Sequence, residues 1–203
     1  MMPFIVFEGI DGSGKSTLSD MTVSILKEKG FKVKKLREPT SGISGKKIRE
    51  FLQSPVAPDP DILLKLFIDD RDEDVRLNIR PAVSSEEIVI MDRYYHSNAS
   101  YQGASGLSYH RILKTNIERG FPKPDRVYLL DCDPVLALAR VSSRNDAQGV
   151  AGDNFERADF LSEVRRIYKE IADESFCILD ATISLDENLE IVYDDIIRNL
   201  IHG

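Results

Sequence analysis

The sequence predicts an α/β protein in which helices flank a five-stranded parallel sheet. Short apolar runs alternate with amphipathic stretches along the chain, which is the pattern of parallel strands joined by crossover helices. A length of 203 residues with 42% hydrophobic content is sufficient for one core of this kind. Because no repeat, low-complexity tract or long linker divides residues 1–203, we expect a single domain.

The first half of the chain supplies two of the strands and a helical insertion. The apolar run at residues 4–7 is followed by a glycine-rich turn and an amphipathic segment, so a strand and then a helix are expected. Gly30 is typical of the residue that ends such a helix. The second strand is predicted at residues 32–36, and the pattern between Gly42 and Arg80 indicates inserted helices.

The second half supplies the other three strands, which are predicted at residues 88–91, 126–130 and 176–179, with helices between them. A polar stretch at residues 142–154 interrupts the alternation. The chain is expected to finish with a helix from about residue 187 to residue 201.

The turn after the first strand carries a phosphate-binding pattern. Gly9, Gly14, Lys15 and Ser16 fit G-x-x-x-x-G-K-[ST], in which glycines allow backbone N–H groups to surround phosphate oxygens. The helix N-terminus and the Lys15 ammonium add positive charge, and the Ser16 hydroxyl can bind Mg²⁺. The stretch therefore predicts a nucleotide site; the alternative is a glycine-rich turn with a surface lysine.

Charged residues also follow the second and third strands. Because the carboxyl ends of parallel strands meet at one edge of the sheet, we expect Arg37, Asp92 and Arg93 to lie near the phosphate loop. Asp92 can hold a Mg²⁺-bound water, and the two arginines can bind phosphate groups. The alternative is that Asp92 caps a helix and Arg93 pairs with a surface carboxylate.

Two arginines, Arg140 and Arg144, precede a polar stretch that contains Gly149 and Gly152. Arginines beside a glycine-containing loop suggest a lid that closes over a transferring phosphate and excludes water. The alternative is a solvated loop between two helices.

Composition excludes several classes of protein. The net charge of −7 argues against a nucleic-acid or membrane-surface protein, because a polyanion requires a broad cationic face. Cys132 and Cys177 adjoin apolar runs, so buried free thiols in a reducing cytosol are expected. No apolar run reaches the length of a membrane span, and the N-terminus lacks a signal pattern, so we expect a cytoplasmic protein.

Taken together, these motifs resemble the thymidylate kinase family. The resemblance covers nearly the whole chain, in family order. It is carried by FEGIDGSGKST at 7–17, REP at 37–39, Phe67 with DR at 70–71, DRY at 92–94 with SN at 97–98 and YQ at 101–102, PKPD at 122–125, and FER at 155–157. It implies a three-layer P-loop NTPase fold with an arginine-bearing lid at about 142–154. It also implies phosphorylation of dTMP by MgATP, and a homodimer.

The resemblance also implies how dTMP is bound. Phe67 would stack on thymine and Arg71 would donate to its O4, where cytosine carries an amino group instead. Asn98 and Gln102 would belong to the base pocket, and Tyr101 would face C2′ of the sugar.

Roles in phosphate transfer follow from the same resemblance. Arg37 and Arg93 would hold the acceptor phosphate, while Asp11 would approach the sugar 3′-hydroxyl or the hydration shell of the metal. The implied catalytic residues are Lys15, Asp11, Arg93, Arg140 and Arg144. The implied ATP-binding residues are Gly9, Ile10, Asp11, Gly12, Ser13, Gly14, Lys15, Ser16 and Thr17, with Ser16 and Asp92 at the Mg²⁺.

The sequence departs from many relatives at two places. Gly12-Ser13 stands where some relatives carry an arginine, so the missing charge is expected from a lid arginine. Thr40-Ser41-Gly42 replaces glycines that follow the proline in many relatives.

Two other functions stay open at this point. One is a deoxynucleoside kinase, in which Glu8 or Glu38 would deprotonate a sugar hydroxyl. The other is a nucleotide-dependent switch, although the sequence has no Asn-Lys-x-Asp guanine motif.

Overall fold

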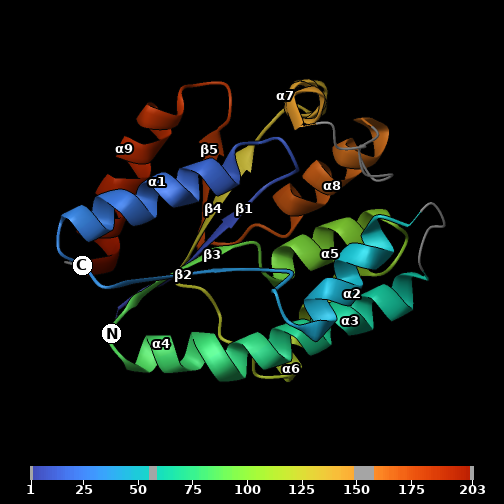
Figure 1. Cartoon of the computed structure of the whole chain (residues 1–203), viewed down its shortest axis with the longest axis horizontal. Coiled ribbons are helices and arrows are strands. Elements are labelled where there is room, and N and C mark those ends of the chain that lie inside the picture. The colour runs from blue at the N-terminus through green and yellow to red at the C-terminus, as the bar shows by residue number, and fades with distance from the viewer. Residues whose placement is uncertain (1, 55–58, 149–157, 202–203) are drawn as a thin grey trace.

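Helices cover both faces of a five-stranded sheet in the computed structural model, which describes residues 2–54, 59–148 and 158–201 (Figure 1). All four strand pairings are parallel, and the strand order is β2-β3-β1-β4-β5. The predicted α/β class and its five-stranded parallel sheet are thereby confirmed. The strands are β1 (Phe4–Glu8), β2 (Val33–Arg37), β3 (Ile88–Asp92), β4 (Arg126–Asp131) and β5 (Phe176–Asp180).

The described helices fall where the amphipathic stretches indicate. Those in the first half are α1 (Lys15–Glu28), α2 (Ile43–Leu52), α3 (Pro60–Asp74), the π-helix η1 (Val75–Ile79), α4 (Arg80–Ser84) and α5 (Tyr95–Ala104). Those in the second half are α6 (Tyr109–Glu118), α7 (Pro134–Gln148), α8 (Ala158–Glu170), α9 (Leu185–Asp195) and the π-helix η2 (Ile196–Ile201).

The central strand β1 is apolar on both faces because helices pack on both. Ile5 and Phe7 point into a core formed with α1, α9 and η2, while Phe4 and Val6 point into a core formed with α3, η1, α4 and α5. All four side chains are buried. Among the residues that the structure describes, no helix combines the length and apolarity required to cross a membrane.

Each strand ends with a charged residue, one position beyond its predicted apolar run. These residues are Glu8, Arg37, Asp92, Asp131 and Asp180. Pairing continues through them because backbone hydrogen bonds, not side chains, hold a sheet together; Asp92, for example, lies between Phe7 and Arg37 in the register. The carboxyl edge of the sheet is therefore lined with charge.

Two boundaries differ from the predictions. Helix α7 extends to Gln148, so residues 142–148 are helical rather than a polar loop. No glycine or proline interrupts this segment before Gly149, and Val141 anchors it in the core. The rest of the predicted lid, residues 149–154, and the FER motif at 155–157 lie outside the described residues. Helix α9 begins at Leu185 because a Ser184–Glu187 capping box satisfies its first turn.

His96 is a buried ring that none of the predicted site motifs includes. It packs between Tyr95 and Phe176, and its Nδ1 lies 3.9 Å from a carboxylate oxygen of Glu8. Burial lowers the pKa of His96 from 6.5 to about 3, against the opposing charge of Asp173. The unfolded chain therefore binds a proton that the native protein excludes between these two pH values.

This proton difference makes stability fall as the pH falls below about 6.5. We expect wild-type protein to lose about 1.4 kcal/mol of unfolding free energy through His96 between pH 7.5 and pH 5.5. A His96→Phe variant should lack that component, which urea unfolding at the two pH values measures. Equal pH dependence in the two proteins would contradict the burial of a neutral His96.

Candidate active site

The loop between β1 and α1 fits closely against helix α7. Gly12 has a φ of +85°, and a Cβ atom there would lie 2.2 Å from the carbonyl oxygen of Ala137. A side chain at this position would clash with the backbone of α7. In addition, residues other than glycine rarely adopt such a φ. An arginine at position 12 would therefore require α7 to move away from the loop.

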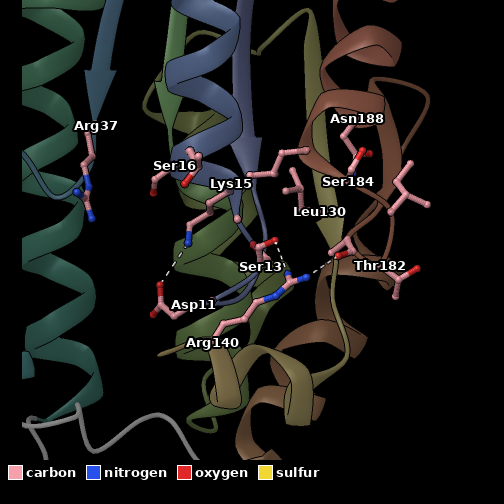
Figure 2. Close-up of a pocket in the computed structure, with 16 residues that line it drawn as sticks. Asp11, Ser13, Lys15, Ser16, Arg37, Leu130, Arg140, Thr182, Ser184 and Asn188 are labelled. Atoms are coloured by element: carbon pink, nitrogen blue, oxygen red, sulfur yellow. Dashed lines mark hydrogen bonds and ion pairs between the residues drawn. The ribbon is translucent and has the colours of Figure 1, made fainter. Parts of the chain in front are cut away.

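The loop borders a large cleft of about 750 Å³, a volume within the range of small-molecule sites. The opposite wall comes from the segment that follows β5. Figure 2 shows the arrangement of its side chains around the N-terminus of α1. The cleft is lined by residues 11–17, Arg37, Leu130, Arg140, residues 181–185 and Asn188.

Lys15 occupies the centre of this cleft. Its Nζ donates to Asp11 Oδ1 at 3.2 Å and to the Ile10 carbonyl at 3.5 Å, as Figure 2 shows for Asp11. Burial, together with the positive charge of Arg93, lowers the pKa of Lys15, while Asp11 and Asp92 oppose that shift. The ammonium is thus held by the Asp11 carboxylate at the helix N-terminus, where a phosphate would also be attracted.

Arg140 reaches the phosphate loop from α7. Its Nη1 donates to the Ser13 carbonyl at 3.4 Å and its Nη2 donates to the Ala181 carbonyl at 3.0 Å. Figure 2 shows the side chain extending between Ser13 and the loop that carries Thr182. Of the two predicted lid arginines, this one lies in the cleft. Arg144 belongs to α7, but its side chain lies outside the described residues.

Ser16 and Asp92 meet at the edge of the sheet. The Ser16 hydroxyl donates to Asp92 Oδ2 at 2.7 Å, and Arg37 Nε lies 3.7 Å from the same oxygen. Asp92 Oδ1 is buried, and within the described part of the chain it has no hydrogen-bond partner. A hydroxyl and a free carboxylate oxygen beside a phosphate loop suit a hard cation such as Mg²⁺. Asp92 does not cap a helix here.

Mg²⁺ typically takes few protein ligands beside water and phosphate oxygens. In keeping with this, no group of three or more His, Cys, Asp or Glu side chains within the described ranges could hold a metal ion. The Ser16–Asp92 pair therefore fits a Mg²⁺ ion that arrives with a polyphosphate.

A smaller pocket of about 100 Å³ adjoins the cleft. Asp11 lines both, so the two cavities meet at this residue. The smaller pocket contains all the predicted dTMP-binding residues except Arg37, which lines the large cleft. It is lined by Asp11, Glu38, Pro39, Leu52, Phe67, Arg71, Arg93, Tyr94, Ser97, Asn98, Tyr101 and Gln102.

Arg93 connects the smaller pocket to Asp11. It has a φ of +72°, and its guanidinium pairs with Asp11, donates to the Ser97 hydroxyl at 2.8 Å and lies 5.1 Å from the centre of the Tyr101 ring. Desolvation acts against ionisation of Asp11, but Arg93 and Lys15 hold the pKa of Asp11 below its ordinary value. Arg93 thus pairs with a site carboxylate, not with one on an unrelated surface.

Tyr101 and Asn98 provide polar groups at the wall of this pocket. The Tyr101 hydroxyl accepts from the Asp11 N–H at 3.1 Å, and burial followed by the negative charge of Asp11 raises the pKa of Tyr101. Asn98 donates to the Gln102 side chain, while Asn98 Oδ1 is buried without a partner in the described ranges. An unpaired buried oxygen is available to a ligand that carries a donor.

Glu8 is fully occupied by the protein itself. Its Oε1 accepts from the N–H groups of Tyr94 at 2.9 Å and Ser97 at 3.1 Å, and its Oε2 accepts from the hydroxyls of Ser97 and Tyr168. Burial raises the pKa of Glu8, against the attraction of Arg93. A structural role for Glu8 was not predicted, although its place at the end of β1 is a signal for one. It holds the turn that carries Arg93.

Both carboxylate oxygens of Glu38 also accept hydrogen bonds from the protein, because they pair with the Arg71 guanidinium. Neither Glu8 nor Glu38 is free to deprotonate a sugar hydroxyl, which counts against a deoxynucleoside kinase.

The loop after Pro39 also has a defined shape. The Thr40 hydroxyl and N–H donate to the two oxygens of buried Asp70, at 2.6 Å and 2.8 Å, and Arg49 donates to the Thr40 carbonyl at 2.7 Å. Thr40 thus anchors the loop to α3.

The wall of the cleft that follows β5 was not predicted from the sequence. Ala181, Thr182, Ser184 and Asn188 line it. The signal was available, because the rule that singled out Arg37 and Asp92 at strand ends applies equally to the last strand. Those residues are neutral, so they lack the charge by which Arg37 and Asp92 could be recognised.

A phosphate loop after the central strand, with one cleft and one adjoining pocket at the carboxyl edge of the sheet, defines a P-loop nucleotide kinase. The family model described as thymidylate kinase matches residues 7–192. The chain belongs to the thymidylate kinase family: it is a dTMP kinase, an ATP-binding transferase that phosphorylates dTMP to dTDP.

Relatives support this assignment over most of the chain. A probable thymidylate kinase of Archaeoglobus fulgidus is 44% identical over 183 residues, which is 90% of this chain and 89% of that protein. A probable thymidylate kinase of Pyrobaculum aerophilum is 40% identical over 89% of both chains. The thymidylate kinase of Leptospira interrogans is 37% identical over 91% of this chain and 86% of its own.

Proposed function

We propose that ATP binds in the large cleft, that dTMP binds in the smaller pocket, and that phosphoryl transfer takes place where the two meet at Asp11. The observation that carries this proposal is the position of Asp11, which lines both cavities and pairs with both Lys15 and Arg93. Two nucleotides placed end to end across such a junction would bring their phosphates together.

On the donor side, backbone N–H groups of residues 9–17 would surround the phosphates of ATP, and Lys15 would contact the β and γ groups. Arg140 already lies against the phosphate loop, so it would supply the charge that Gly12 cannot. The catalytic role of Arg144 and the lid at about 142–154 stay predictions. The single domain of residues 1–203 stays a prediction as well.

On the acceptor side, Phe67 would stack on thymine and Arg71 would donate to O4. Asn98 and Gln102 would complete the base pocket, and Tyr101 would exclude a ribose 2′-hydroxyl. Phe67 is half-buried and is not part of the apolar clusters beneath it, which supports a face open to a ligand.

The acceptor phosphate would be held by Arg93 and Arg37. Arg93 lies at the junction, and Arg37 enters the same region from the end of β2 with most of its side chain exposed. Asp11 would accept a hydrogen bond from the sugar 3′-hydroxyl or from water around the metal. Arg71 would not take part in phosphate binding, because Glu38 compensates its charge.

Ser16 and Asp92 would hold Mg²⁺, which when bound would neutralise charge on the phosphates of ATP. The reaction needs no strong base, because an oxygen of the dTMP phosphate is anionic near neutral pH. That oxygen forms a bond to the γ phosphorus while the bond to the β–γ bridging oxygen breaks, which releases ADP and dTDP. Catalysis would then depend on alignment and on cations around the transferring group.

We also propose a cytoplasmic homodimer that binds neither nucleic acid nor membranes. Ile62 on α3, Leu77 on η1 and Ile117 on α6 are large apolar side chains that are exposed in the single chain and that a dimer would cover. The net charge of −7 supports the absence of polyanionic partners.

The proposal is tested by measuring ADP release from ATP with dTMP, dUMP, dCMP, dGMP, UMP or thymidine, each with and without Mg²⁺. We expect efficient Mg²⁺-dependent turnover with dTMP. Because dUMP lacks the methyl group, its transition state should be bound less tightly by about 1–3 kcal/mol. Its kcat/KM should therefore be roughly tenfold to a hundredfold lower than that of dTMP. Turnover with thymidine but not with dTMP, or turnover that ignores the monophosphate, would contradict the proposal.

A further inference from the structure

Arg71 is a fully buried arginine whose guanidinium is fixed on several sides. Its Nε and Nη2 donate to the carboxylate of Glu38, and its Nη1 donates to Asn116 Oδ1 at 2.7 Å. The ring of Tyr94 lies 5.3 Å from the guanidinium carbon. These contacts come from the loop after β2, from α6 and from the residue that precedes α5, so separate segments fix the plane of one side chain.

The contacts leave donors to spare. A guanidinium has five N–H groups, and three of them are used by Glu38 and Asn116. For the other two, on Nη1 and Nη2, the described part of the chain offers no hydrogen-bond partner. Because Arg71 also lines the smaller pocket, these are the donors that a ligand there can meet.

Glu38 and Asn116 act differently on Arg71. The Glu38 carboxylate compensates the positive charge, so Arg71 meets a ligand as a hydrogen-bond donor more than as a cation. Asn116 is neutral and binds the outer nitrogen, Nη1, which also carries one of the spare donors. Loss of the Asn116 contact would free a second N–H on Nη1 and let the guanidinium rotate.

The Asn116 side chain is held in one orientation by the backbone of its own helix, α6. It is completely buried, and its Nδ2 donates to the Ile112 carbonyl one turn earlier in the helix at 2.7 Å. This bond turns the amide so that its oxygen faces Arg71. Asn116 does not line either cavity, so it can act on a ligand through Arg71 and not by direct contact.

We propose that Asn116 is a positioning residue for base recognition, which fixes Arg71 so that its spare donors meet an oxygen on the base. The proposal rests on the proposed function, in which Arg71 faces the O4 atom of thymine. A base with an amino group at that position would place donor against donor. Discrimination between dTMP and dCMP should therefore depend on Asn116, while the phosphoryl-transfer step should not.

Two substitutions separate this role from simple packing. Asn116→Leu keeps the number and branching of the side-chain heavy atoms but removes the acceptor of Arg71. Asn116→Asp keeps an oxygen facing Arg71, and in its protonated form it still donates to the Ile112 carbonyl. Thr115→Val is the matched control, because the Thr115 hydroxyl bonds to the Arg111 carbonyl within α6 and does not contact Arg71.

Dissociation constants for dTMP and dCMP, measured by calorimetry, and the kinetic constants for dTMP provide the readout. For Asn116→Leu we expect a KM for dTMP about tenfold higher, a kcat within about threefold of wild type, and a preference for dTMP over dCMP about tenfold smaller. Asn116→Asp and Thr115→Val should keep the wild-type preference. If Asn116→Leu does not fold, Asn116→Ala removes the same acceptor and gives the same readout.

A folded Leu or Ala variant with wild-type KM and wild-type preference would overturn the proposal. A uniform loss of kcat at unchanged preference would overturn it too, because that is the effect of a structural defect. Failure of the proposed function is recognised separately: if dTMP does not bind in the smaller pocket, an Arg71→Ala variant will also keep the wild-type dissociation constant for dTMP.

Discussion

Lys15→Ala is expected to lower kcat by at least about a hundredfold, which is the usual effect of removing one preorganised charge stabiliser. Lys15 is buried at the N-terminus of α1, where it is held by Asp11 at the junction of the two cavities. In the proposed reaction its ammonium stabilises charge on the γ-phosphoryl group. Steady-state kinetics with saturating ATP and dTMP measure the effect.

Lys27→Ala is the matched control, since Lys27 lies on the exposed side of the same helix and lines neither cavity. We expect it to keep wild-type turnover. Circular dichroism should show that both variants are folded. A folded Lys15→Ala protein with turnover near that of wild type would refute the role assigned to Lys15.

Arg93→Ala is expected to lower kcat/KM for dTMP by roughly a hundredfold to a thousandfold, the range for loss of a buried charge at a reacting group. Arg93 pairs with Asp11 and is held by Ser97, so its removal leaves the Asp11 carboxylate with Lys15 alone as a cationic partner. Alanine keeps a Cβ atom, so the backbone strain at a φ of +72° does not change.

Arg93→Lys separates charge from geometry. A lysine restores one positive charge but not the planar fork that can bind Asp11, Ser97 and a phosphate together, so we expect it to recover only about a tenth of the activity. Arg198→Ala, an exposed arginine on η2 that pairs with Asp194, serves as the control with full activity. Equal activity of Arg93→Ala and wild-type protein would show that another group holds the acceptor phosphate.

Some residues of the site could be predicted from the sequence and others could not. Arg37, Asp92 and Arg93 could be expected at one edge because each follows a strand, and strand direction is written in the chain order. Asn116 could not be expected there, since it lies on a helix 45 residues after Arg71 and carries no motif. Its contact exists because α6 packs beside α3 and α5, which local patterns do not specify.

The end of helix α7 is a second feature that the sequence did not predict. The polarity of residues 142–148 suggested a loop, yet the segment is helical because no glycine or proline stops it and its first turns are packed in the core. Arg140 lies on the same helix, before the stretch at 142–154 for which a lid was predicted, and its side chain reaches the phosphate loop.

The sequence by itself determined the sheet, the order of its elements, the phosphate loop and the family, because these depend on periodicity and on short motifs within contiguous stretches of chain. The tertiary structure alone decided that Glu8 and Glu38 are occupied by protein donors, that Arg71 keeps spare donors, and that Asp11 joins the two cavities. Each of these depends on side chains from distant segments competing for the same hydrogen bonds, and that competition is settled only when the helices pack against the sheet.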